Sequence, residues 1–214
     1  VDDQIRRAIN LHYRKFPARI LSDNNGLQQE IPNPALYEYP LEGEAKFIAK
    51  AMRHIFFEMV RHEHVPFTFI RGEARSKFQW SILPDVTVNF TMSIDRIDKI
   101  SDGTNGEIVR LIDYKSGSDA TEFPSLESLF DFSGTKNTKG IFQLMTYCCA
   151  YADEHRLPEE TPLRPLIYPL RTVATEGIPP LLYNKKEFNN FREIESGFRA
   201  RLAEKVAEIF NPSV

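Results

Sequence analysis

The chain has 214 residues and a formal net charge of −3, with 42% apolar and 27% charged residues. This length fits one domain of ordinary size, or one domain with an appendage, and the composition allows a sizeable core in a soluble protein. The slight negative charge excludes a general attraction to polyanions. Any contact with nucleic acid must therefore come from local basic patches.

The sequence has no run of 18 apolar residues and no apolar signal region at its start, so we expect neither a membrane span nor a secreted protein. Cys148 and Cys149 are adjacent within an apolar helical pattern, which predicts buried thiols in a reducing compartment and excludes a disulfide framework. We therefore expect a cytoplasmic location. The chain begins at Val1 inside a predicted helix, which suggests a piece of a longer protein.

The first 60 residues contain two helical patterns around a connector. Residues 1–16 have approximately helical spacing of apolar side chains, and residues 17–40 are rich in Pro, Asn and Gln. Residues 41–60 form a clear amphipathic helix with one broad apolar face. We place a domain boundary after residue 40, so that residues 1–40 precede a main domain at 41–214.

Alternating apolar residues predict strands in the middle of the chain. Residues 67–90 alternate loosely and are broken near Pro84, which favours two strands. Residues 90–97 and 108–114 flank a Gly/Asn/Asp-rich connector and predict a β-hairpin.

The second half returns to helices. A polar loop over residues 116–139 precedes a helix at 141–155, short strands at 163–173 and 178–182, and a long amphipathic helix at 188–210. This order of elements predicts an α/β fold with a mixed central β-sheet flanked by helices.

The hairpin carries charged side chains among apolar neighbours. Asp95 lies on its first strand, and Asp113 lies on its second strand with Lys115 two residues further, hence on the same face. Two carboxylates and an amine are costly to desolvate there unless they neutralise one another or hold a cation. Hard cations such as Mg²⁺ and Mn²⁺ prefer oxygen ligands, and the backbone carbonyl of Tyr114 could complete such a set.

Three motifs carry a resemblance to a known family: Asp-Arg-Ile-Asp at 95–98, Ile-Asp-Tyr-Lys-Ser-Gly at 112–117 and Gln-x-x-x-Tyr at 143–147. Together they resemble the PD-(D/E)XK nuclease superfamily, and more narrowly the RecB/AddB-type nuclease domains of bacterial helicase–nuclease repair enzymes. The resemblance covers about residues 67–152. It implies a restriction-endonuclease-like core and metal-dependent, exonuclease-like cleavage of DNA.

By this resemblance, Asp95 and Asp113 are metal ligands for Mg²⁺ or Mn²⁺, and Lys115 is the catalytic lysine. Gln143 and Tyr147, one helical turn apart, are the pair that helps to position the DNA strand. The resemblance also implies DNA as the substrate and a helicase domain or subunit as a partner.

The sequence departs from the family pattern in two places. Met92 stands where the family commonly has a glycine, and neither His12 nor His54 has the expected surroundings of the histidine that often serves as a further metal ligand. We expect that histidine upstream of Val1. Asp85 is an alternative first acid, but the preceding proline favours a turn over a buried site, so we prefer Asp95.

Other charged residues have two interpretations. Asp98 is more simply a salt-bridge partner than a site residue, and Glu73 is a candidate additional carboxylate. Three cations near the first strands are either ordinary exposed residues or phosphate contacts; these are Arg71, Arg75 and Lys77. We interpret Lys136 and Lys139 as solvated loop charges in preference to DNA contacts. The sequence His62-Glu63-His64 favours a solvated turn over a metal site.

Two classes of function remain open. The first is a divalent-metal-dependent DNA nuclease of a repair or recombination helicase–nuclease. The alternative is a catalytically inactive nucleic-acid-binding or scaffold domain that retains the nuclease fold. A third, less favoured class is a metal-dependent hydrolase with another substrate. The presence of Asp95, Asp113 and Lys115 on one face favours the first class, because a purely structural descendant would have no reason to keep all three.

Overall fold

The computed structural model describes residues 1–13, 19–22, 28–31, 38–83, 86–104, 106–131 and 137–210. The contacts divide the chain into two compact units, Val1–Arg61 and His62–Val214. Each unit has its own cluster of buried apolar side chains.

The described residues of the first unit include helical segments and a pair of short strands. Helix α1 spans Asp2–Ala8 and continues as a π-helical turn over Ile9–Tyr13. Strands β1 (Arg19–Ser22) and β2 (Gln28–Ile31) pair antiparallel, and helix α3 spans Glu44–His62. Both predicted helices are confirmed over the described residues, whereas the predicted connector contains a short β-pair.

In the part of the first unit that the structure describes, the buried core is small. It consists of Ile5, Ile9 and Ala45, with a few partly buried apolar side chains against them. The helical spacing of α3 brings Ile48 to the same side as Ala45, so the amphipathic pattern itself explains why α3 packs on α1. The compact units divide after Arg61, although we expected a domain boundary after residue 40. That domain boundary stays a prediction.

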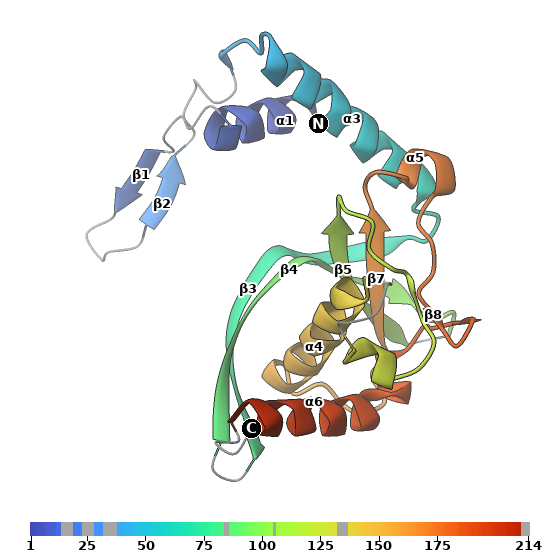
Figure 1. The fold of residues 1–214 in the computed structure, drawn as a ribbon. Helices are drawn as coiled ribbons and strands as arrows, with labels where there is room; N and C mark the ends of the chain where they lie inside the picture. The colour runs from blue at the N-terminus through green and yellow to red at the C-terminus, as the bar shows by residue number, and fades with distance from the viewer. Residues whose placement is uncertain are drawn as a thin grey trace. The chain divides into compact units, whose positions relative to one another are not determined.

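A four-stranded sheet organises the second unit (Figure 1). Its order is β3-β4-β5-β7, in which the first three strands are antiparallel and β7 runs parallel to β5. The strands span Phe67–Leu83 (β3), Val86–Ser101 (β4), Glu107–Lys115 (β5) and Leu163–Pro169 (β7). The sheet is therefore mixed, as the sequence predicts.

The turn between β4 and β5 is built from side-chain hydrogen bonds. Asp102 Oδ1 accepts hydrogen bonds from the backbone N–H groups of Thr104 and Gly106, at 2.7 and 3.1 Å. A Cβ at Gly106 would collide with the Asp102 carboxylate, and Gly103 has a φ of +86°. The register then runs from Ser101 opposite Glu107 toward the acidic residues, which confirms the predicted hairpin.

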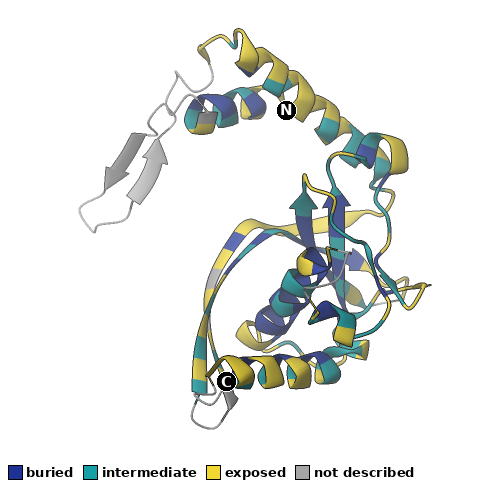
Figure 2. Ribbon diagram, in the orientation of Figure 1, coloured by how far each residue is buried: buried dark blue, intermediate teal, exposed yellow. Residues whose placement is uncertain are grey.

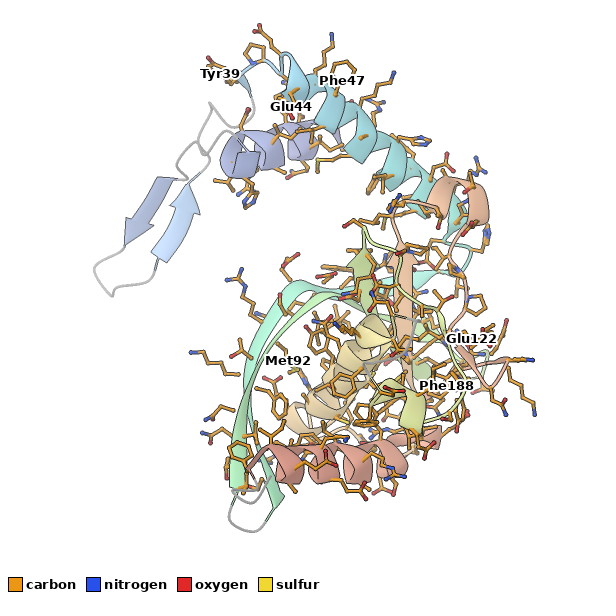
Figure 3. The ribbon with its side chains drawn as sticks, in the orientation of Figure 1. Tyr39, Glu44, Phe47, Met92, Glu122 and Phe188 are labelled. Atoms are coloured by element: carbon orange, nitrogen blue, oxygen red, sulfur yellow. The ribbon has the colours of Figure 1, made fainter. Side chains whose placement is uncertain are left out.

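Helices cover the sheet. Helix α4 (Lys139–Glu154) connects β5 to β7 and packs on both strands, and helix α6 (Glu195–Phe210) packs against α4 and β3. Long, curved strands β3 and β4 bend around α4 in Figure 1, and Figure 2 shows buried residues gathered in α4 and the neighbouring strands. Figure 3 labels two core side chains, Met92 of β4 and Phe188. Cys148 and Cys149 of α4 are both buried and free, as predicted.

The segment predicted as a loop at 116–139 contains short structure. Strand β6 (Glu122–Phe123) joins β8 (Leu182–Tyr183) and β9 (Lys186–Glu187) in a second, three-stranded sheet. A 3₁₀ turn follows β6 at Glu127–Leu129, and buried Phe123 stacks on Tyr183 with ring centroids 4.9 Å apart.

Two short helical segments complete this part of the chain. Helix α5 spans Val173–Glu176, and a 3₁₀ turn at Phe191–Glu193 leads into α6. Within the described ranges, no helix has both the length and the apolar character needed to cross a membrane.

Candidate active site

Asp95 and Asp113 approach each other across the β4–β5 hairpin. The β4–β5 ladder ends with Arg96 opposite Ile112, so Asp95 and Asp113 are the next residues on the two strands, and the charge of Asp95 acts on Asp113. The Asp95 Oδ2 atom accepts a hydrogen bond from the backbone N–H of Tyr114 at 2.7 Å. The Asp95 carboxylate is thus held by the backbone of the residue that follows Asp113.

Strand β4 changes its side-chain alternation at Asp95. Ile94 and Ile97 both belong to the core although they are an odd number of residues apart, while the ladder with β3 keeps one register from Ile94 to Ile97. The ladder pairs on either side place Glu73 of β3 across from Asp95, and Glu73 has a φ of +47°, rare for a non-glycine residue. Glu73 is exposed. It stays a candidate additional carboxylate.

A chain of polar contacts leads from Asp113 into helix α4. Lys115 Nζ lies 2.8 Å from Asp113 Oδ2 and donates a 3.0 Å hydrogen bond to Gln143 Oε1. Gln143 Nε2 in turn donates to the Tyr147 hydroxyl at 2.7 Å. Strand spacing aligns Asp113 with Lys115, and helical spacing aligns Gln143 with Tyr147. The structure therefore brings the predicted residues into one connected group.

Burial dominates the electrostatics of this group. Desolvation raises the pKa of Asp113, the nearby Lys115 ammonium opposes the rise, and the charges of Asp95 and Asp119 add to it. Asp113 is only 6% exposed, so its loss of hydration outweighs the attraction of Lys115. Burial alone would lower the pKa of Lys115, but its hydrogen bond with Asp113 and the surrounding carboxylates raise it. The site is therefore short of positive charge.

A third carboxylate, Asp119, lies beside Lys115. Its Oδ1 atom accepts a 3.2 Å hydrogen bond from Asn137 Nδ2 just before α4 begins. A Cβ built at Gly140 would lie 3.0 Å from Asp119 Oδ1 and 3.2 Å from Lys115 Cε. The two side chains therefore converge over a glycine in the first turn of the helix.

The opposite face of the hairpin holds a buried ionic network. Arg110 Nε donates to Asp98 Oδ1 at 2.6 Å, and Arg96 also forms an ion pair with Asp98. Arg110 reaches Glu63 at 3.0 Å, and the Tyr168 hydroxyl donates to Glu63 at 2.6 Å. Asp98 is fully buried, so its predicted role as a salt-bridge partner is confirmed.

Tyr114 links this network to the site. Its backbone N–H binds Asp95, whereas its hydroxyl contacts the Arg96 guanidinium, a contact that raises the pKa of Arg96 against the effect of burial. The Arg96 guanidinium also lies 4.1 Å from the centroid of the Phe67 ring. The residue between Asp113 and Lys115 is therefore held from both faces of the sheet.

The remaining candidates are exposed, belong to the first compact unit or lie outside the described residues. The cations of β3 and Lys139 at the start of α4 are all exposed; those of β3 are Arg71, Arg75 and Lys77. His12 and His54 belong to the first compact unit. Asp85 and Lys136 lie outside the residues that the structure describes.

A model of the PD-(D/E)XK nuclease superfamily matches residues 8–214. The chain belongs to the PD-(D/E)XK nuclease superfamily. A search among curated proteins found no match. The mixed sheet with helix α4 between β5 and β7 is consistent with the restriction-endonuclease-like fold of this superfamily, and membership indicates a nuclease.

Superfamily nucleases typically use divalent metals, so the donor set is tested for its fit to one. In the described part of the chain, no three His, Cys, Asp or Glu side chains group closely enough to hold a metal ion. Asp113 Oδ2 is nevertheless buried without a well-aligned hydrogen bond, and Asp95 faces it across the hairpin. Two carboxylates with a backbone carbonyl fit a hard cation that keeps several water ligands.

The sequence did not predict the structural roles of Glu63 and Asp119. The sequence His62-Glu63-His64 favours a solvated turn, yet Glu63 accepts four hydrogen bonds, from Arg96, Arg110 and Tyr168. Asp119 stands in a polar loop, and its return to Lys115 depends on the path of that loop. The spacing of an acid four residues after Lys115 was the one available sign.

Proposed function

We propose that this superfamily member is a divalent-metal-dependent DNA nuclease. The observation that carries the proposal is the connected group on one face of the sheet, in which Asp113 meets Lys115 and Lys115 meets Gln143. A buried carboxylate short of positive charge has the character of a cation ligand. An inert structural ion pair would instead be neutral, like the Asp98 network on the other face.

Asp95, Asp113 and the Tyr114 carbonyl would hold Mg²⁺ or Mn²⁺. When bound, the metal supplies an activated water and neutralises charge on the scissile phosphate. The Tyr114 N–H keeps Asp95 Oδ2 oriented, so the carboxylate enters the site with its geometry set.

Lys115 supplies a fixed positive charge where negative charge develops on the phosphate. Gln143 holds the ammonium with its amide oxygen, and Tyr147 holds the amide of Gln143 in the orientation that presents this oxygen. Gln143 and Tyr147 thus orient the Lys115 ammonium, and by the family resemblance the same helical pair would help to position a nucleic-acid strand.

The three motifs support a finer assignment. We infer that the chain is a RecB/AddB-type domain that acts with a helicase domain or subunit in DNA repair or recombination, in the cytoplasm and as an exonuclease. The support for this assignment is the motif resemblance. Comparison of linear and circular DNA substrates tests the exonuclease assignment, because an exonuclease needs an end.

The test of the proposal is cleavage of end-labelled linear DNA with Mg²⁺, Mn²⁺ or a chelator. Asp113→Asn keeps the shape of the side chain but removes the charge, and it is expected to lower the rate about 100-fold or more. The matched control is Asp153→Asn, at the other end of α4 from the site, where Asp153 pairs with Arg199. Its cleavage rate should match the wild type.

Two results would decide against this function. DNA cleavage that persists in Asp113→Asn would exclude this group as the active site. Metal-dependent binding of DNA without cleavage by the wild-type chain would favour the alternative, a nucleic-acid-binding domain that retains the nuclease fold.

A further inference from the structure

The Lys115 side chain is surrounded by residues that lie outside the Asp-Tyr-Lys motif. Its ammonium is shared between Asp113 and Gln143, and its side chain remains 23% exposed. A flexible lysine with two partners on different elements can leave either of them. Something must limit the path of its methylene chain if the ammonium is to stay at the reacting phosphate.

The first turn of α4 provides that limit. Helix α4 begins at Lys139, and Gly140 is buried directly under the Lys115 side chain. A Cβ on Gly140 would stand 3.2 Å from Lys115 Cε, closer than ordinary van der Waals contact. Glycine therefore leaves room for the lysine to lie against the start of the helix while it reaches Gln143 one turn further on, whereas a larger residue would require Lys115 or Asp119 to shift by a few tenths of an ångström.

Asp119 closes the other side. Its Oδ1 atom lies over the same glycine, 3.0 Å from where a Cβ would be, and its Oδ2 atom lies 3.2 Å from the corresponding point on Gly117. Asn137 donates to Oδ1, and the backbone N–H of Ala120 donates to the Asn137 carbonyl at 3.0 Å. The loop after β5 is thus tied to Asn137, two residues before α4 begins, which fixes the carboxylate beside the lysine.

We propose that Asp119 and Gly140 are positioning residues for Lys115, an inference that rests on the proposed nuclease function. Gly140 provides the space in which the lysine side chain lies, and Asp119 provides a second carboxylate that lies over the same glycine. The ammonium contacts Asp113 and Gln143, while Asp119 lies beside the methylene chain that leads to it. Neither positioning residue needs to touch the metal or the DNA.

Gly140→Ala separates positioning from folding. Alanine is a better helix former than glycine, so the variant should keep or raise the melting temperature. Its methyl group should displace Lys115 and Asp119, and kcat should fall about 10-fold with an unchanged KM for DNA. A variant that merely perturbed structure would lose stability together with activity.

Asp119→Asn tests the carboxylate. Asparagine keeps an oxygen for Asn137 but loses the charge that faces Lys115, so kcat should fall about 10-fold and the melting temperature should stay near the wild-type value. Asp153→Asn is again the matched control. It lies about 20 Å from Gly140 along α4, and its kcat should not change.

A double-mutant cycle in urea unfolding gives a readout that needs no activity. The chains compared are the wild type, Asp119→Asn, Lys115→Met and the double variant, and a coupling free energy between the two sites is expected. No coupling, or an unchanged kcat in both Asp119→Asn and Gly140→Ala, would overturn the proposal. A wild-type chain that cleaves no DNA would contradict the nuclease function itself, while the unfolding cycle would still decide whether Asp119 holds Lys115.

Discussion

Asp113 combines deep burial with a charge that its surroundings do not fully balance. Its raised pKa has desolvation as the largest cause, and Asp95 and Asp119 strengthen the effect of burial. Such a group stores an energetic cost that disappears when a cation arrives. The buried charge of Asp113 therefore lowers the stability of the metal-free chain and raises its affinity for a positively charged ligand.

This cost has a measurable pH dependence. Because the pKa in the folded chain lies above its ordinary value of 3.8, the folded chain binds the proton more tightly than the unfolded chain does. The contribution of Asp113 to stability is therefore full below pH 3.8 and is lost as the pH rises through the raised pKa. Without metal, the melting temperature of Asp113→Asn should rise relative to that of the wild type as the pH increases from 3.8 through the raised pKa of Asp113. A gap that moves in favour of the wild type as the pH rises would contradict the assignment.

The β4–β5 hairpin carries opposite chemistry on its two faces. One face presents Asp95 and Asp113, whereas the other buries Asp98 against two arginines. Hydrogen bonds from Arg110 and Tyr168 lower the pKa of Glu63 in this second group, although burial alone would raise it. The back of the hairpin is thus neutralised internally, which gives the active face a rigid support.

Asp98→Ala should be strongly destabilising. It removes a fully buried carboxylate and leaves Arg96 and Arg110 short of negative charge, so a loss of about 3–5 kcal/mol of unfolding free energy is expected. The matched comparison is Glu107→Ala, which breaks the exposed pair with Lys99 on the same two strands and should cost about 1 kcal/mol or less. Urea unfolding measures both. Equal losses would show that the buried network does not support the hairpin.

The sequence predicts this hairpin well because its signals are local. Alternation and a Gly/Asn/Asp turn define the strands, and period-2 spacing puts Lys115 on the side of Asp113. Contacts between residues that only the folded chain brings together are not predicted in this way. Glu63 joins Arg110 from far along the chain, and Asp119 reaches Lys115 through a loop with little periodicity, so neither role could be derived from spacing.

The two compact units differ in the size of their cores. The first unit buries Ile5, Ile9 and Ala45, whereas the second unit builds an extensive core around α4 and the sheet. A small core offsets less of the conformational entropy lost on folding. We therefore assign the site and most of the stability to His62–Val214.

Hydrogen exchange followed by mass spectrometry tests this difference. Backbone amides of α1 and α3 should exchange much faster than those of β5 and α4, because local opening exposes little apolar surface in the first unit. The internal reference is α6, whose buried Phe198 and Leu202 belong to the larger core and should confer slow exchange. Equal protection of α3 and α4 would show that the first unit is stabilised by more than its own core.

The most direct test of the whole account is the position of a metal ion. Crystals of the chain soaked with Mn²⁺ should give one anomalous scattering peak between Asp95 and Asp113, about 2.1 Å from an oxygen of each carboxylate. Asp113→Asn crystals treated in the same way should lose that peak. A peak bound elsewhere, or none between these carboxylates, would contradict the assignment of this hairpin as a metal-dependent nuclease site.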